Sequence, residues 1–450
     1  MNFTSKKLAP LTGADCFVLA LSRMMKSQGQ NGLIGQTQLQ LEGVPDIAAL
    51  QAGAKRFGAG YPLLNARVRR SLFSLVPSWR QDIRSDRILG LQLWKEEGAE
   101  VVDGGDLIAK EVKSQHHLAE DLLNSPLEDQ SGVRNLRLDL ILLRHGGSAL
   151  LFTWDHLLFD GKGAELLVRD FIESFKGTRL PEYSNRPAIP VPISVQLKKS
   201  KPATDRFFEL VSNNYRSLSG NNPGPCRLRY KLLKFDPEET IKIQERATAF
   251  SGLFAISFYL ACAARGHRQA FLSRGSDPTH YVSSILVQLR RKGAHSDPFQ
   301  NRVTVLFFSL KKEDLGSMQD AVNAAQSQFE DMTRKELGPS FEMILRLMRR
   351  LPSFFYLKFL GTHFSGQITS FFHSSTGMFA LSESHLCGSR ITDAYHVPSV
   401  SAPPGSGLFF GEYRGQLTAT FSWRDGAVTE AEADLILAQV KKDLTGSDLE

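Results

Sequence analysis

Residues 148–175 predict a strand, a tight turn and a helix in immediate succession, and this segment constrains the fold more than any other. The stretch from Ser148 to Trp154 (SALLFTW) is apolar and β-prone, as a buried strand is. Beyond it, apolar residues of 162–175 recur at helical intervals. Between the two stands the pattern His-x-x-x-Asp-Gly, at His156, Asp160 and Gly161. The pattern therefore places an imidazole where a strand ends, at the mouth of a cleft.

A histidine beside apolar residues is often an ordinary core residue, and this alternative has to be weighed. The chain offers its own comparison, because His117 and Asp121 have the same spacing. They lie in SQHHLAEDLL, where Leu122 replaces the glycine and no strand precedes them, so we interpret them as a solvated helix face. At His156 the strand, the glycine and the helix agree, which favours a functional role.

The His156 pattern resembles the active-site motif of the condensation-domain superfamily, which includes chloramphenicol acetyltransferase, plant BAHD acyltransferases, wax ester synthases and nonribosomal peptide condensation domains. Other segments resemble the superfamily's motifs in the same order, over nearly the whole chain. They are YPLLNARV from Tyr61, LNSPLE from Leu123, ILVQLR ending at Arg290, FQN ending at Asn301, and ITS ending at Ser370, followed by Gly377. The resemblance implies an α/β fold of two chloramphenicol-acetyltransferase-like subdomains. Their mixed sheets are flanked by helices, and an active-site tunnel lies between them.

The sequence departs from the superfamily pattern in three places. Asp155 stands where many members have a second histidine, and strand alternation predicts that it faces away from the cleft of His156. Gln300 replaces the glycine of a Gly-Asn pair. No Asp-Phe-Gly-Trp-Gly segment occurs near the C-terminus, which argues against a plant-type BAHD enzyme.

The chemistry of acyl transfer gives His156 a role as general base. A neutral imidazole accepts the proton of an attacking hydroxyl or amine at cellular pH and then returns it to the leaving thiol. The tetrahedral intermediate also needs an oxyanion donor. The candidates are the backbone N–H near Gly161 and the hydroxyl of Thr369 or Ser370.

Asp160 lies beyond the turn, so we expect it to hold the loop rather than to act as a second base. The resemblance implies that its partner is Arg290, and that Asn301 gives further structural support. Gly161 has two open interpretations: close approach of substrate to the backbone, or a backbone conformation with positive φ.

Composition indicates a globular chain, since 42% of the 450 residues are hydrophobic and 22% are charged. Four scattered cysteines without a C-x-x-C pair indicate a reducing compartment and no zinc site. Because the N-terminus lacks the apolar core of a signal peptide, we expect a cytoplasmic protein, with peripheral membrane association open. The net charge of +7 comes without a nucleic-acid-binding motif, so no nucleic-acid partner is expected. A basic surface also suits the phosphates of coenzyme A or an acidic carrier protein.

The chain divides into two α/β halves. We expect a first half over 1–180, a proline-rich linker over 181–205 and a second half over 206–450. Segment 341–364 is apolar with interspersed arginines, so it can lie on a membrane surface near a lipid acceptor or pack as core between the halves. Pro352 breaks this segment into short pieces, which favours packing.

These observations predict an acyltransferase that moves an acyl group from a thioester to a hydroxyl or amine. The donor is an acyl-coenzyme A or an acyl carrier protein, and the acceptor is a small molecule or a lipid. No resident cofactor or metal is expected. Two alternatives stay open: a free-standing condensation enzyme of the nonribosomal peptide type, and a catalytically silent binding module of the same fold.

Overall fold

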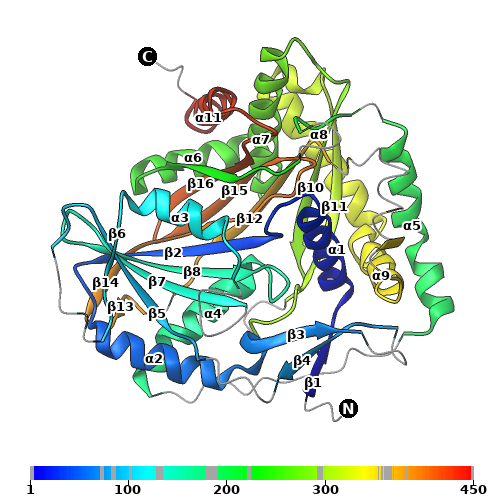
Figure 1. Ribbon diagram of the computed structural model, residues 1–450. Helices are drawn as coiled ribbons and strands as arrows, with labels where there is room; N and C mark the ends of the chain where they lie inside the picture. Colours follow the sequence, from blue (N-terminus) through cyan, green and yellow to red (C-terminus); the bar gives the residue numbers. More distant parts are fainter. Residues whose placement is uncertain are drawn as a thin grey trace.

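A computed structural model describes most of the chain. The described residues are 5–70, 75–82, 88–100, 104, 106–127, 135–177, 191–213, 215–219, 224–290, 297–352, 354–355, 358, 367, 369–381 and 383–446. Two large sheets stand side by side, and helices pack against each of them (Figure 1).

The first sheet carries the candidate histidine. Its strands, in order across the sheet, are β13 (His385–Leu386), β14 (Ser389–Val397), β2 (Ile34–Glu42), β8 (Ser148–Asp155), β7 (Leu136–Leu142), β5 (Leu91–Glu96) and β6 (Lys110–Val112). The pairs β5–β7 and β5–β6 are parallel, and the other pairs are antiparallel. The sheet is therefore mixed, with the predicted hairpin β7–β8 near its centre.

The second sheet is also mixed. Its strands, in order, are β11 (Val303–Lys311), β10 (His280–Gln288), β12 (Phe371–Met378), β15 (Ser406–Tyr413), β16 (Gln416–Arg424) and β9 (Leu228–Lys234). Strand β12 pairs in parallel with β10 and β15. A small antiparallel sheet, β1 (Ser5–Pro10), β4 (Ser78–Asp82) and β3 (Ala66–Arg69), lies beside the first.

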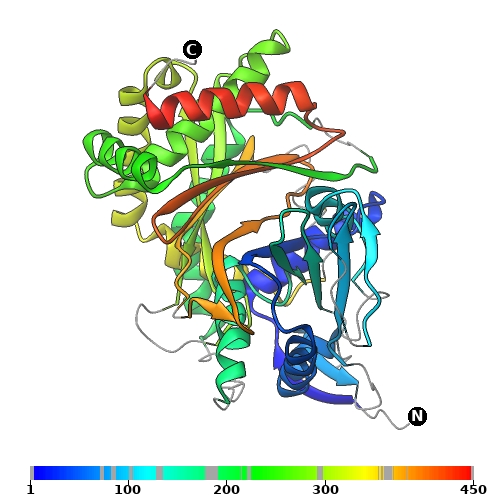
Figure 2. The same cartoon turned by 90° about the vertical axis from the view of Figure 1, so that its left-hand side faces the viewer.

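Strand β14 belongs to the second half in sequence but pairs with β2 in the first sheet, from Arg390 opposite Glu42 to Val397 opposite Gln36. Figure 2 shows β14 in orange beside the blue β2. The two halves are thus interlocked by main-chain hydrogen bonds.

Helices cover the sheets where the sequence supplies apolar stripes. The helices are α1 (Gly13–Ser27), α2 (Ile47–Gly60), α3 (Gln115–Leu123), α4 (Gly161–Glu173), α5 (Ile193–Val211), α6 (Pro237–Ser251), α7 (Ala255–Ser273), α8 (Met318–Arg334), α9 (Leu337–Met348) and α11 (Glu430–Thr445). Alternation in β8 decides which side each residue covers: Phe152 packs edge-on against Phe171 of α4, whereas Leu151 joins the core under α3. The buried α7 residues Phe258 and Phe271 anchor the helical layer of the second sheet.

The expected linker is irregular only in part. Helix α5 occupies 193–211, so residues 193–205 of the expected linker are helical, and 178–190 lie outside the described residues. The domain boundaries at 180 and 206 stay predictions.

Within the described residues, no single helix is long and apolar enough to cross a bilayer; α6 and α7 pass that test only as a pair, and they are bent by 98° at their junction.

Candidate active site

His156 follows directly after the last residue of β8. Its backbone N–H donates to the carbonyl of Leu33, 3.0 Å away, which extends the pairing of β8 with the segment before β2. The next N–H, of Leu157, donates to Asp155 Oδ1 at 2.9 Å. These two hydrogen bonds fix the turn from both sides of the histidine. We refer to residues 155–161, which contain the predicted general base His156, as the catalytic turn.

The His156 ring is half-buried and packs beside Trp154, with 5.4 Å between ring centroids. Its Nδ1 atom is buried, and among the described residues it has no hydrogen-bond partner. No described carboxylate therefore orients the ring in the way that the aspartate of a Ser-His-Asp triad does. The backbone of the turn and the indole position it instead.

Asp160 begins helix α4 as its N-cap. Its Oδ1 accepts from the Gly163 N–H at 2.8 Å, and its Oδ2 accepts from the Arg302 N–H at 2.8 Å. Arg290 Nη1 donates to both oxygens, at 2.7 and 2.6 Å, and the two side chains are each only 4% exposed. The ion pair is therefore desolvated, and each carboxylate oxygen of Asp160 accepts two hydrogen bonds from the protein.

Arg290 also ties the turn to the segment that precedes β11. Its Nη2 donates to the carbonyls of Pro298 and Gln300, and the Gln300 N–H donates to the carbonyl of Leu158. Gln300 has φ 73°, in the left-handed region that favours glycine. The glycine that stands here in the superfamily pattern suits this conformation, and this chain holds a glutamine in it.

Asn301 connects the catalytic turn with the first helix. Its Nδ2 donates to the His156 carbonyl at 3.0 Å and to Asp15 Oδ1 at 2.9 Å. Asp15 is fully buried in the capping box of α1, where it also accepts from the Thr12 N–H. Burial raises the pKa of the Asp15 carboxyl, and the hydrogen bonds from Asn301 and Thr12 oppose that rise. Sequence analysis missed Asp15, although Thr12-x-x-Asp15 is readable as a helix start.

The two glycines of the turn serve different needs. Gly161 does not have a positive φ, and a Cβ on it would meet only Thr376 Cγ2, at 3.2 Å. The interpretation of Gly161 as a residue with positive φ is therefore wrong. A Cβ on Gly163 would lie 2.3 Å from the Pro298 carbonyl oxygen and 3.1 Å from Arg290 Nη2. Gly163, which the sequence did not single out, is the sterically required glycine.

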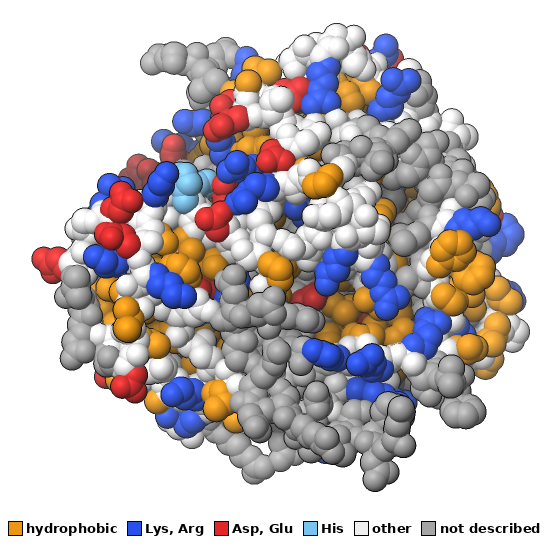
Figure 3. Space-filling view, in the orientation of Figure 1, with side chains coloured by type: hydrophobic (Ala, Val, Ile, Leu, Met, Phe, Trp, Pro, Cys, Tyr) orange, Lys and Arg blue, Asp and Glu red, His pale blue; other side chains and the backbone are white. Residues whose placement is uncertain are grey.

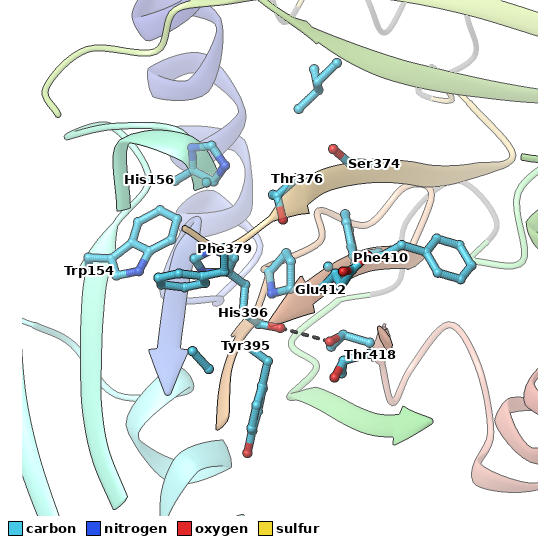
Figure 4. A pocket seen from close by; sticks show the side chains of 17 residues that line it. Trp154, His156, Ser374, Thr376, Phe379, Tyr395, His396, Phe410, Glu412 and Thr418 are labelled. Carbon is cyan, nitrogen blue, oxygen red and sulfur yellow. Dashed lines mark hydrogen bonds between the residues drawn. The ribbon is translucent and has the colours of Figure 1, made fainter. Parts of the chain in front are cut away.

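A cavity of about 90 Å³ lies beside His156, between the two large sheets. The catalytic turn and β14 line it from the first sheet, and β12, β15 and β16 line it from the second. Its walls are largely apolar, with Trp154, Phe379, Phe409 and Phe410 among them. Figure 4 shows His156 on one side of this space and Thr376 and Ser374, on β12, on the other.

The predicted oxyanion hydroxyls do not line this cavity. Ser370 precedes β12 and its Oγ accepts from the Val282 N–H, while Thr369 is fully buried. Ser374 and Thr376 are the β12 hydroxyls that reach the cavity. Strand β12 begins at Phe371, after both candidates, and the residues whose hydroxyls reach the cavity lie four to seven positions further along the chain.

A second histidine, His396 on β14, lines the same cavity. Thr37 Oγ1 lies 2.9 Å from its Nδ1, and Glu165 Oε1 of α4 lies 3.5 Å from its Nε2. Glu165 is buried and pairs with Lys162 on its other oxygen. These groups add polar atoms to the cavity beside its aromatic walls, because the His396 ring stacks on Phe379 with 5.1 Å between ring centroids. Nothing in the local sequence around His396 predicts this, because its neighbours come from β2 and α4.

The segment 341–364 is partly described. Up to Met348 it forms α9, which packs against α5, as the Ala203 N–H donating to Ser340 Oγ at 2.9 Å shows. Leu351, Phe354 and Phe355 are exposed, and residues 353, 356–357 and 359–366 lie outside the described part. Contact with a membrane through this segment stays a prediction.

Comparison with solved structures identifies the fold. The TRI3 trichothecene 15-O-acetyltransferase from Fusarium sporotrichioides superposes with a TM-score of 0.69 at 13% identity, over 98% of this chain and 95% of that one. The first condensation domain of the calcium-dependent antibiotic synthetase superposes with a TM-score of 0.67 at 14% identity, over 97% and 96%. Polyketide synthase associated protein 5 from Mycobacterium tuberculosis gives 0.61 at 13% identity, over 98% and 99%. The chain has the condensation-domain fold.

This result confirms the predicted α/β architecture of chloramphenicol-acetyltransferase-like halves with mixed sheets. No protein-family model and no curated protein matches the sequence. The assignment of the condensation-domain fold thus rests on the structural superpositions and on the short motifs. The sequence identities of 13–14% to the superposed structures support a shared fold and nothing further.

Proposed function

We propose that the protein is an acyltransferase that moves an acyl group from a thioester to a hydroxyl or amine, with His156 as general base. The observation that carries the proposal is a half-buried imidazole, without a carboxylate partner among the described residues, at the edge of a cavity between the two sheets. An imidazole that is held in place by packing, and that has no carboxylate partner among the described residues, is suited to exchange a proton with substrate.

The proposed reaction has two steps. A lone pair of His156 accepts the proton of the acceptor O–H or N–H while the acceptor oxygen or nitrogen bonds to the thioester carbonyl carbon. The carbonyl π electrons move to oxygen and form a tetrahedral oxyanion. When this intermediate collapses, the C–S bond breaks and the leaving sulfur takes the proton from the imidazolium. No net proton is gained or lost by the enzyme.

Thr376 supports the oxyanion in this proposal, in place of Thr369 and Ser370. Its side chain lies beside Gly161 at the first turn of α4, where backbone N–H groups and the helix dipole also favour negative charge. The aromatic walls suit an acyl chain, and the polar groups around His396 suit the acceptor.

The test is product analysis by mass spectrometry. Purified protein is incubated with a panel of acyl-coenzyme A and acyl-carrier-protein thioesters, each with hydroxyl and amine acceptors. We expect a transferred acyl product that the His156→Ala variant does not form. Transfer only from carrier-protein thioesters to amines would favour the free-standing condensation enzyme. Binding of thioesters without transfer by wild type and variant alike would favour the silent binding module.

A further inference from the structure

A second hollow lies on the other face of the catalytic turn. It has a volume of about 420 Å³ and is formed by α1, β3, β4 and the end of β8. Asp155 and Leu157 line it, whereas His156 between them lines the first cavity. The placement of Asp155 agrees with the expectation that it faces away from the cleft of His156. The two spaces therefore share one turn of backbone.

Basic side chains converge on this hollow from two elements. Arg23 and Lys26 are three residues apart on α1, which puts them on one face of the helix. Arg67 and Arg69 are two residues apart on β3, which puts them on one face of the strand. Figure 3 shows Lys and Arg side chains grouped over this part of the face, where α1 and β3 lie.

The described lining residues of the hollow carry an excess of positive charge. Asp155 is the one carboxylate among its described lining residues, against four cations. Within the described part of the chain, Lys26, Arg67 and Arg69 make no ion pair and no hydrogen bond through their side chains. Elsewhere, Lys231 is paired with Glu430 and Asp434. Like charges held together without a partner repel one another, so an anion that enters the hollow relieves that repulsion.

We propose that this hollow binds a small molecule that carries a pyrophosphate or a pair of phosphate groups. The volume falls within the range of roughly 300–1,000 Å³ that is usual for small-molecule sites. Three cations without an ion-pair partner among the described residues, Lys26, Arg67 and Arg69, suit an anion of two or more charges better than a monocarboxylate. Guanidinium groups bind phosphate oxygens in a bidentate manner, and a lysine adds a mobile point charge. Two sources share this chemistry: a free nucleotide or pyrophosphate, and the phosphorylated end of coenzyme A.

Occupation of the hollow bears directly on the catalytic turn. The Asp155 carboxylate that faces the hollow also accepts the N–H of Leu157, one residue after the histidine. A bound anion repels this carboxylate, whose hydrogen bond helps to set the shape of the turn. The site is therefore placed to influence His156 without touching it.

Isothermal titration calorimetry with inorganic pyrophosphate in low-salt buffer tests the proposal, and it needs no turnover, so it is independent of the proposed function. We expect one site per chain, with affinity that falls as salt is added. Arg67→Glu and Lys26→Glu, on separate elements, should each weaken binding about tenfold or more, because each replaces an attraction with a repulsion. Lys242→Glu, the same charge change at an exposed position of α6, should leave it unchanged.

Asp155→Asn gives a prediction of opposite sign. It removes the one negative charge among the described residues that line the hollow while it keeps an oxygen for the Leu157 N–H, so pyrophosphate should bind more tightly. Parallel titrations with coenzyme A distinguish the sources. Much tighter binding of coenzyme A than of pyrophosphate, lost in Arg67→Glu, assigns the site to coenzyme A, and equal binding assigns it to a free phosphate compound.

The proposal is overturned if pyrophosphate and coenzyme A do not bind at low salt, or if Arg67→Glu and Lys26→Glu bind them as the wild type does. Binding of an acidic acyl carrier protein alone, sensitive to the same variants, would also overturn it and would make the hollow a protein-docking surface. Thermal melting of each variant without ligand verifies that all are folded.

Discussion

Removing the Asp160 carboxylate should destabilise the protein and abolish activity together. Asp160→Ala leaves the Arg290 guanidinium buried without its counter-charge and strips the N–H groups of Gly163 and Arg302 of their acceptor. Breaking a buried ion pair by removal of one partner costs about 3–5 kcal/mol, and the lost helix N-cap accounts for about 1 kcal/mol of that range.

The assay is urea denaturation, followed by tryptophan fluorescence and circular dichroism, of Asp160→Ala, Arg290→Met and the double variant. Methionine keeps much of the apolar stem of the arginine and removes its charge. Because each single variant leaves the other group uncompensated, we expect the double variant to lose less than the sum of the two losses. The expected coupling is about 1–3 kcal/mol.

Two results would refute this reasoning. A loss below about 1 kcal/mol in Asp160→Ala would mean that water replaces the pair at little cost. Strictly additive losses in the double variant would mean that the two side chains do not stabilise each other. Either result would mean that the ion pair of Asp160 with Arg290 is not the main interaction that stabilises the catalytic turn.

Three further predictions concern the site and its surroundings. His156→Ala should lower kcat by about 10²–10⁴-fold in a steady-state assay and leave the urea midpoint unchanged, because the ring is half-buried and makes no charged contact. Gly163→Ala should melt at a clearly lower temperature than Gly161→Ala, since only the former forces a Cβ against backbone; equal melting temperatures would contradict the assignment. Acid should unfold the protein through two buried histidines, His267 and His373, because burial lowers the pKa of each to about 4 from an ordinary 6.5. The native state keeps them neutral while the unfolded chain binds protons, so their stabilisation is complete above pH 6.5 and is lost as pH falls toward 4. The loss approaches about 2.7 kcal/mol per pH unit for the pair, and His373→Leu should halve that slope in urea titrations.

Local sequence patterns predicted those helices and strands whose apolar residues recur at regular intervals. The strand, turn and helix around His156 follow from alternation, a glycine and helical spacing, and the structure places them as expected. Helix α5 was missed for a physical reason. Its buried face contains Gln196, Ser200 and Ala203, which are polar or small, while Ile193 and Leu197 are exposed. A search for apolar periodicity cannot find such a helix, and Pro202 within it suggests a loop.

The site was predictable only where one segment, or a resemblance, supplied the information. The contact of Asp160 with Arg290 was predicted from the resemblance, because no pattern in either segment indicates that the two residues pair. Asp15 and His396 meet the catalytic turn or its cavity through contacts that span most of the chain, which no local pattern encodes. The candidate hydroxyls of Thr369 and Ser370 lie outside the cavity because a motif does not fix the register at which a strand enters its sheet.

Because β14 pairs with β2, the first sheet cannot be completed until most of the protein has been synthesised. Strand β2 emerges from the ribosome early, but the strand that covers its open edge comes from 389–397, near the other end of the chain. Until then the first sheet presents unpaired N–H and C=O groups along a strand that is otherwise ready to fold. The first half should therefore associate with chaperones or with copies of itself while translation continues, and a fragment of it expressed alone should aggregate unless β14 is supplied as a peptide.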